Sequence, residues 1–189
     1  MGSGLQNIDA SVFVADSARI LGKVEIGCGS SVWFNAVIRS ESHEVRIGRY
    51  SNVQDFAMIH IGYDHPTIIG DFCSITHHAT VHGATVGDDC LIGIGATVMD
   101  GAVIGAGSIV AGGAVVTEGT VCPANAIIVG APAKVVTQRD NREANRLNAW
   151  LYHRNAQAYK ENNHRAWDGE EYERWLEEKK REIQAGEDR

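Results

Sequence analysis

The chain has 189 residues, a formal charge of −7, 44% hydrophobic residues and 22% charged residues. This balance describes a mildly acidic globular protein and excludes the basic surface that nucleic acid or an anionic membrane would require. The 21 glycines keep no three-residue period, which excludes collagen. Because there are only 3 prolines and 7% aromatic residues, the core must be built from small and β-branched side chains.

No apolar stretch approaches the roughly 20 residues of a membrane span. The opening Met1-Gly-Ser-Gly lacks the charged and apolar regions of a secretion signal, so we expect a cytoplasmic protein without a membrane partner. The four cysteines, Cys28, Cys73, Cys90 and Cys122, show no CxxC spacing. We expect reduced, mainly structural thiols.

Along most of the first two thirds of the chain an aliphatic residue recurs every six residues, the period of a hexapeptide solenoid. The phased positions are Ile8, Val14, Ile20, Ile26, Val32, Ile38, Ile47, Val53, Ile59, Ile69, Ile75, Val81, Val86, Ile92, Val98, Ile104, Val110 and Val116. Four residues after 17 of these 18 positions stands a small residue, Tyr63 being the exception. Each short strand therefore places one aliphatic and one small side chain inside, and three strands complete a triangular coil. We expect about six to seven coils, with Cys73 and Cys90 in the interior.

On one of the three faces, glycine follows the aliphatic residue in five successive coils. These glycines are Gly27, Gly48, Gly70, Gly87 and Gly105. Such a column indicates a corner where the backbone excludes a Cβ or takes a positive φ. The whole pattern resembles the parallel β-helix of hexapeptide-repeat proteins, and this resemblance implies a left-handed coil.

Composition changes at about residue 138, after which charged residues are dense and only 2 of the 21 glycines remain. Two amphipathic helices are predicted there, the first with Asp140 and Glu143 as a capped start. Their apolar faces are Leu147, Trp150, Leu151 and Ala158 in the first helix, and Tyr172, Trp175, Leu176, Lys179 and Ile183 in the second. The expected fold is thus an all-β solenoid with an α tail: a β-helix at 5–136, and a helical appendage at 139–186 that packs on the β-helix or on a neighbouring subunit.

Six of the eight histidines lie between His43 and His82. His60 and His82 each follow the aliphatic residue of the same face in consecutive coils, and Arg39 holds the equivalent position one coil earlier. Because coils stack about 4.7–4.9 Å apart, the two imidazoles should lie one above the other. Two stacked imidazoles suit one metal ion, but a catalytic zinc site takes three protein ligands plus water.

His77 is the third candidate ligand. It lies on another face, where Asp55 holds the equivalent position of the preceding coil and Gln54 adjoins Asp55. We do not expect one chain to bring His77 to the other two histidines, whereas a cyclic trimer can take two ligands from one protomer and one from the next. His78 points to the opposite side of the strand and is not expected to bind the same ion.

The six-residue step is broken three times, each time at the turn that leaves the face of His60 and His82. We therefore expect loops at 40–46 and 61–68 to border these two histidines.

The residues assembled so far are Arg39-Ser-Glu41, Asn52-Val-Gln54-Asp55, His60 and His77-His-Ala-Thr-Val-His82-Gly. Over roughly residues 8–135 the chain resembles the γ-class carbonic anhydrases and their γ-carbonic-anhydrase-like relatives. The resemblance implies a homotrimer in which His60, His77 and His82 hold zinc, with iron or cobalt as other options. It also implies that Gln54 orients the metal-bound water, while Arg39 and Asp55 support the interface and the surroundings of the ligands. The activity it implies is that of a lyase, the reversible hydration of CO2 to bicarbonate by a metal-bound hydroxide.

The sequence departs from the family pattern at two places. The loop Ile61-Gly-Tyr-Asp64-His65-Pro66 is short and lacks a proton-shuttling glutamate, which leaves Asp64 or His65 for that role, and Glu41 stands where the family has aspartate. Two alternatives therefore stay open. One is a hexapeptide acyltransferase that uses acyl-CoA and a single histidine as general base. The other is a catalytically weak metal-binding protein of the γ-carbonic-anhydrase-like group.

Overall fold

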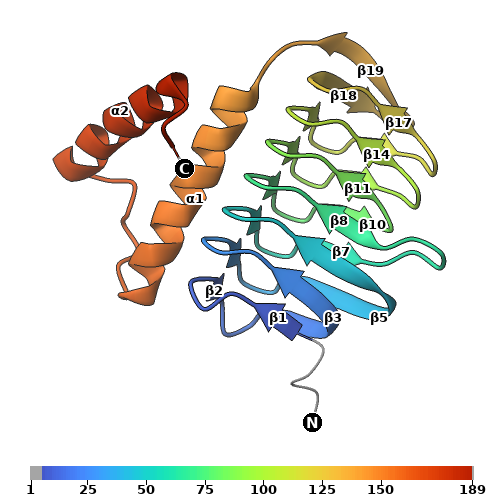
Figure 1. Cartoon of the computed structure of the whole chain (residues 1–189), viewed down its shortest axis with the longest axis horizontal. Helices are drawn as coiled ribbons and strands as arrows, with labels where there is room; N and C mark the ends of the chain where they lie inside the picture. The colour runs from blue at the N-terminus through green and yellow to red at the C-terminus, as the bar shows by residue number, and fades with distance from the viewer. Residues whose placement is uncertain (1–5, 189) are drawn as a thin grey trace.

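The computed structural model describes residues 6–188. Short strands stack into a parallel β-solenoid of about seven turns, and two helices follow along one side of it (Figure 1). This is the expected solenoid with a helical tail. Two expectations fall on residues outside those described, namely the start of the β-helix at residue 5 and the opening Met1-Gly-Ser-Gly.

The strands form two sheets, because one sheet runs continuously over two of the three faces. The first, 11-stranded sheet contains β1 (Gln6–Ile8), β3 (Arg19–Ile26), β5 (Val37–Ile47), β7 (Met58–His60), β8 (Thr67–Ile69), β10 (Thr80–His82), β11 (Thr85–Val86), β13 (Thr97–Val98), β14 (Val103–Ile104), β16 (Val115–Val116) and β17 (Val121–Cys122). The second, 8-stranded sheet contains β2 (Phe13–Val14), β4 (Ser31–Val32), β6 (Asn52–Val53), β9 (Ser74–Ile75), β12 (Leu91–Ile92), β15 (Ile109–Val110), β18 (Ala126–Gly130) and β19 (Ala133–Gln138). All pairings are parallel except that of β18 with β19.

The phased aliphatic residues fill the interior, as the six-residue rule predicts. Ile38, Ile59 and Ile92 are each 0% exposed, and so are the small residues Cys73 and Cys90 that stand between them. Each coil buries its aliphatic residues only against its neighbours, so the core is one continuous column.

The glycine corner follows from close packing between coils. Neither Gly48 nor Gly105 has a positive φ, but a Cβ on Gly48 would lie 2.6 Å from the carbonyl carbon of Gly70, and one on Gly105 would lie 2.4 Å from the nitrogen of Ala124. Of the two reasons considered for the column, exclusion of the Cβ is therefore the one that applies.

The first of the two expected loops, at 40–46, is part of a strand. Residues 40–46 belong to β5, which continues around the corner and pairs with β3 on both sides of it, with a shift in register between Gly22 and Val24. Between the pairs Gly22–Ser40 and Val24–Val45, β3 has one residue and β5 has four, so the three extra residues of β5 remain extended as an irregularity in the pairing. The expectation of a loop at 40–46 is thus wrong, whereas residues 61–66 do form a loop between β7 and β8.

Helix α1 (Arg142–Lys160) lies against strands β2, β4, β6 and β9 of the second sheet, and α2 (Glu170–Ala185) packs on α1 (Figure 1). The expected capping pair does not start α1. Asn141 is the N-cap and makes no side-chain cap bond, and Asp140 instead accepts a hydrogen bond from the nitrogen of Arg142, 3.1 Å away. No helix among residues 6–188 is both long and apolar enough to cross a bilayer.

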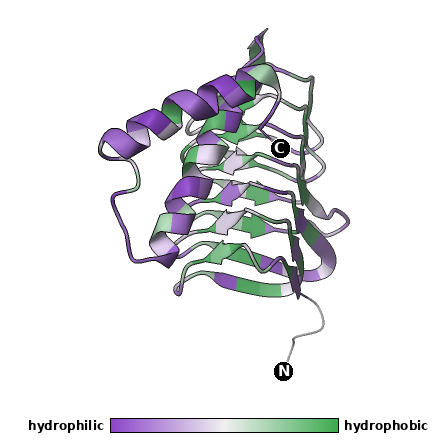
Figure 2. Ribbon diagram, turned by 60° about the vertical axis from the view of Figure 1, so that its left-hand side comes forward, coloured by the Kyte–Doolittle hydropathy of each residue, from purple (hydrophilic) through white to green (hydrophobic). Residues whose placement is uncertain are grey.

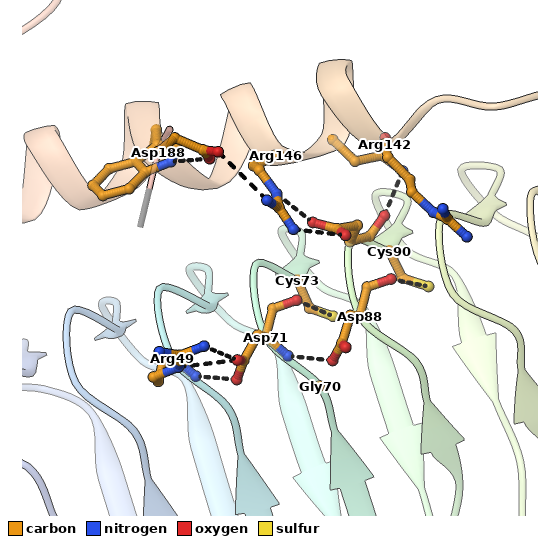
Figure 3. A network of polar contacts seen from close by, with 12 residues as sticks. Arg49, Gly70, Asp71, Cys73, Asp88, Cys90, Arg142, Arg146 and Asp188 are labelled. Carbon is orange, nitrogen blue, oxygen red and sulfur yellow. Dashed lines mark hydrogen bonds and ion pairs between the residues drawn. The ribbon is translucent and has the colours of Figure 1, made fainter. Parts of the chain in front are cut away.

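A polar network fastens α1 to the solenoid. Arg146 donates two hydrogen bonds to Asp89, of 2.8 and 3.0 Å, and a third contact of 3.5 Å joins it to Asp188 (Figure 3). The nitrogen of the Trp150 ring donates to the other oxygen of Asp188 over 3.0 Å. Helix α2 is mainly hydrophilic (Figure 2). The principal contact of the tail with the strands is made by α1.

Candidate metal centre

His60 and His82 come together as the repeat predicts. They end strands β7 and β10, which pair in register so that His82 lies opposite His60. The ring centroids are 4.9 Å apart, and Nδ1 of His60 lies 3.0 Å from Nε2 of His82. Both side chains are partly exposed, at 18% and 31%, so they remain open to a ligand.

The remaining nitrogen of each ring is held by a carboxylate. Nε2 of His60 donates to Glu41 over 2.9 Å, and Nδ1 of His82 donates to Asp100 over 2.5 Å. The hydrogen bond from His60 lowers the pKa of Glu41, and the charge of Arg39, which is paired with Glu41, acts in the same direction.

This arrangement fits a cation between the rings. A neutral imidazole has one N–H and one lone pair. Since the two N–H groups are used on Glu41 and Asp100, the nitrogens that face each other both present lone pairs. Lone pairs 3.0 Å apart repel one another unless a proton or metal ion lies between them. Two nitrogens bound to one tetrahedral zinc would lie about 3.3 Å apart, close to the separation observed.

His77 lies elsewhere in the chain, two residues after strand β9 of the second sheet. Its Nδ1 lies 3.0 Å from Asp55, and its Nε2 is 3.4 Å from the hydroxyl of Tyr152 in α1. Within residues 6–188 of one chain, no cluster of three or more histidine, cysteine or acidic side chains could hold a metal. The three candidate ligands are thus divided into a pair and a single histidine, and each has one nitrogen on a carboxylate.

The other candidate residues lie on the coil of His60, in the loop that follows it, or on the coil before it. Arg39 is paired in register with His60 one coil away, and its guanidinium contacts Glu41. Gln54 is 2% exposed and donates to Asn52 over 2.9 Å. Asp64 and His65 are exposed in the loop 61–66.

His78 points away from His77 and stacks on Phe56. The two rings are 5.0 Å apart and inclined by 4°, and His78 has a φ of 58°. His43, which lies in strand β5, is 3.0 Å from the carbonyl oxygen of Tyr63. Neither histidine contacts the pair of His60 and His82.

Sequence reasoning missed Asp100 and Tyr152. Asp100 stands two residues after the phased Val98, so the register places it one coil beyond His82 and could have identified it. Tyr152 had no such signal because α1 lies outside the repeat. Burial raises the pKa of Tyr152 to about 12, and the charge of Asp55 acts in the same direction, so the hydroxyl beside His77 is held protonated.

Comparison with known proteins agrees with this architecture. Residues 83–118 match the family described as bacterial transferase hexapeptide (six repeats), which defines the chain as a left-handed hexapeptide-repeat β-helix. A carbonic anhydrase from Geobacillus kaustophilus is 44% identical over 143 residues, which cover 74% of this chain and 79% of that protein. The chain therefore belongs to the γ-carbonic-anhydrase-like family.

Other relatives match over shorter stretches. A probable carbonic anhydrase from Methanocaldococcus jannaschii is 47% identical over 46% of this chain, and the mitochondrial γ carbonic anhydrase 1 of Arabidopsis thaliana is 44% identical over 47% of it. The matched segments span only 55% and 34% of those two proteins. A crystal structure named a putative acetyltransferase from Bacillus cereus superposes with a TM-score of 0.80 at 34% identity, covering 83% of this chain and 92% of that one.

Proposed function

We propose that the protein is a metal-dependent carbonic anhydrase that catalyses the reversible hydration of CO2 to bicarbonate. The observation that carries the proposal is the pair of His60 and His82, with two lone pairs directed at one point and a carboxylate behind each ring. Carboxylates in this position fix the tautomer of metal-binding histidines and raise their basicity. The names of the relatives support the same activity.

The proposed site needs two protomers. His60 and His82 of one protomer would hold zinc together with His77 of the neighbouring protomer in a homotrimer, since His77 is not beside the pair in its own chain. A bound zinc ion lowers the pKa of its water to about 7 and so supplies the nucleophile, as is established for carbonic anhydrases. Iron or cobalt could occupy the same nitrogen donors.

The chain's own residues have three proposed tasks. Gln54 is buried and held by Asn52, so its amide can orient a water beside His77. Asp55 fixes the proton of His77 on Nδ1, so the lone pair lies on Nε2, which would exchange its 3.4 Å contact with Tyr152 for the metal. Arg39 neutralises Glu41, the carboxylate behind His60, and supports the subunit interface.

Proton release is the next requirement of hydration. Asp64 or His65 is proposed to carry the proton to solvent, because both side chains are exposed in the loop that follows His60. The four cysteines are free, which suits a reducing compartment and supports the proposal of a cytoplasmic protein.

An acyltransferase remains the second candidate. It is favoured by the match to the transferase hexapeptide family and by the likeness to structures named acetyltransferase and hexapeptide transferase. Such chemistry would use one histidine as general base and would give no role to the stacked second histidine. A catalytically weak metal-binding protein is the third possibility.

Metal analysis together with solution mass tests the site and the assembly. Chains of 20.4 kDa should form trimers of about 61 kDa with one metal ion per chain, and His60→Ala should abolish metal binding. Stopped-flow hydration of CO2 then tests catalysis. Full metal loading without hydration above the buffer rate would reject the enzyme while retaining the site. Metal-free protein that transfers an acyl group from acyl-CoA would support the second candidate.

A further inference from the structure

Four amide and hydroxyl side chains connect Gln54 to helix α1. Nε2 of Gln54 donates to Oδ1 of Asn52 over 2.9 Å, and Nδ2 of Asn52 donates to Oγ of Ser74 over 3.0 Å. The hydroxyl of Ser74 donates in turn to Oδ1 of Asn148 over 2.8 Å. Gln54, Asn52 and Ser74 are 2%, 1% and 0% exposed, so water does not compete for the two bonds that join them, whereas Asn148 is half-buried.

In this series of hydrogen bonds, the direction of each bond follows from the bond that Asn148 makes. Each side-chain amide has one acceptor oxygen and one NH2 donor, and a hydroxyl has a single hydrogen to donate. Because Asn148 accepts from Ser74, Ser74 must accept from Asn52, and Asn52 must accept from Gln54. If Asn148 donated instead, the hydrogen of the Ser74 hydroxyl would be released to donate to Asn52. Asn52 would then be free to turn its amide and accept from Ser74, and Gln54 would present its NH2 group rather than its oxygen.

The oxygen of Gln54 is the group left for other partners. Oε1 of Gln54 has no hydrogen bond among the described residues. It is not sealed from solvent either, since the only fully buried side-chain polar atom without a partner in residues 6–188 is Oδ1 of Asn125. Gln54 also adjoins Asp55, the carboxylate that holds His77. The oxygen without a partner is therefore carried by the residue next to the carboxylate that holds His77.

We propose that Asn148 of helix α1 is a positioning residue that fixes Gln54, through Ser74 and Asn52, with its oxygen directed at the metal centre. The helical tail thereby sets which hydrogen-bonding group the solenoid presents beside His77. The catalytic consequence rests on the proposed function, whereas the orientation of the Gln54 amide does not.

Three variants test whether Asn148 acts through its acceptor oxygen or only through its packing. Asn148→Asp keeps an acceptor for the Ser74 hydroxyl and a similar shape. Asn148→Leu keeps the number and branching of the side-chain heavy atoms but has no acceptor, and Ser74→Ala removes the middle link. Asn155→Leu is the matched control, because Asn155 lies on the same helix and takes no part in the chain of bonds.

The first readout is the side-chain NH2 group of Gln54 in the zinc-loaded full-length protein. The chain has five glutamines, so ¹⁵N-glutamine labelling gives few signals, and Gln54→Glu assigns the relevant pair. We expect slow hydrogen exchange of this NH2 group in the wild type, in Asn148→Asp and in Asn155→Leu. Exchange should be fast in Asn148→Leu and in Ser74→Ala.

The second readout is the hydration of CO2. Asn148→Leu and Ser74→Ala should lower kcat about tenfold at unchanged zinc content, with KM changed less than about twofold, whereas Asn148→Asp should remain within about twofold of the wild type. Equal losses in Asn148→Asp and Asn148→Leu would overturn the proposal, and so would an unprotected NH2 group in the wild type. If Asn148→Leu does not fold, Ser74→Ala decides by the same criteria, with thermal unfolding as the check on its structure.

The proposed function and this inference can fail separately. If the wild type hydrates no CO2 but the exchange pattern holds, the function is rejected and the positioning role stands. If the wild type is active and Asn148→Leu matches it in both readouts, the function stands and the positioning role is rejected.

Discussion

His82 donates its Nδ1 proton to Asp100 across 2.5 Å, from one coil of the solenoid to the next. The contact selects the tautomer of His82, because a proton on Nδ1 leaves the lone pair on Nε2. That lone pair faces Nδ1 of His60. The neighbouring coil therefore determines which nitrogen of His82 is available to a metal.

Replacing Asp100 by asparagine should weaken the proposed metal centre. A neutral amide accepts the Nδ1 proton less strongly than a carboxylate and raises the basicity of the ring less. We expect zinc affinity to fall about 10- to 100-fold, with a parallel fall in hydration. Competition with a chromophoric chelator measures the affinity. Glu118→Gln is the control, since Glu118 holds the equivalent exposed position one coil further on, and an unchanged affinity in Asp100→Asn would refute the role.

Gly83 leaves the space in which Asp100 reaches His82. Gly83 has a φ of 57°, and a Cβ there would lie 2.8 Å from the nitrogen of Gly62 and 2.4 Å from Oδ1 of Asp100. Gly119 has a φ of 65°, but a Cβ there would meet nothing within 4 Å. Alanine at either position should cost about 1–2 kcal/mol for the left-handed backbone. Gly83→Ala should lose more than Gly119→Ala in urea unfolding, and of the two it alone should weaken zinc binding.

The stacking of His60 on His82 could be predicted because it follows from the repeat itself. A residue one position after an inward Ile59 or Val81 must point outward, and equal phase places both on one line. The contact with Asp100 depends instead on the course of the corner after His82. The repeat places Asp100 one coil beyond His82, but the individual turn decides whether its carboxylate reaches the ring.

The polar contacts of α1 could not be predicted from the apolar pattern either. That pattern selects Leu147 and Trp150, which pack in one cluster with Phe72 of the solenoid and Ile183 of α2. The polar side chains of Asn148 and Tyr152 also meet the solenoid, and they bond to residues more than 70 positions away. Polar contacts over such distances leave no periodic signal in the sequence.

If the metal lies between protomers, two inactive variants should restore activity together. His77→Ala and His82→Ala trimers each lack one ligand at every site. A mixed trimer has one interface at which an intact His82 meets an intact His77. Equal amounts unfolded and refolded together should recover about a quarter of the wild-type sites, measured as bound zinc and as hydration.

The same two variants mixed without refolding provide the control, because no subunits are exchanged. Recovery in the unexchanged mixture, or none after refolding, would contradict a site shared between protomers. The solution mass of the refolded mixture establishes that trimers have formed.

Asp89 should matter more for stability than the similar pair formed by Asp71. The side chain of Asp89 is 8% exposed and binds Arg146 through two bonds, whereas Asp71 and its partner Arg49 are 29% and 61% exposed. Burial raises the pKa of Asp89, and Arg146 opposes this effect. Asp89→Ala should cost about 2–3 kcal/mol because it leaves the guanidinium of Arg146 without its main partner. Asp71→Ala should cost at most about 1 kcal/mol in the same urea titrations, and equal losses would contradict the difference in burial.

His153 should make the attachment of α1 sensitive to acid. Its Nδ1 donates to the carbonyl of Gly29 over 2.8 Å, and its ring packs against Tyr50 and Trp150. Burial lowers the pKa of His153 below its ordinary value, and the bond to Gly29 opposes this only in part. Between the folded pKa and about 6.5 the unfolded chain binds more protons than the folded one, so stability is lost as the pH falls through this range.

The urea midpoint should therefore fall more between about pH 7.5 and about pH 5.5 in the wild type than in His153→Gln, which keeps a donor for Gly29 but does not titrate. The other seven histidines are the same in both proteins, so the difference between the two slopes isolates His153. Both proteins are compared at one zinc concentration. Parallel pH profiles would show that protonation of His153 does not oppose the docking of α1.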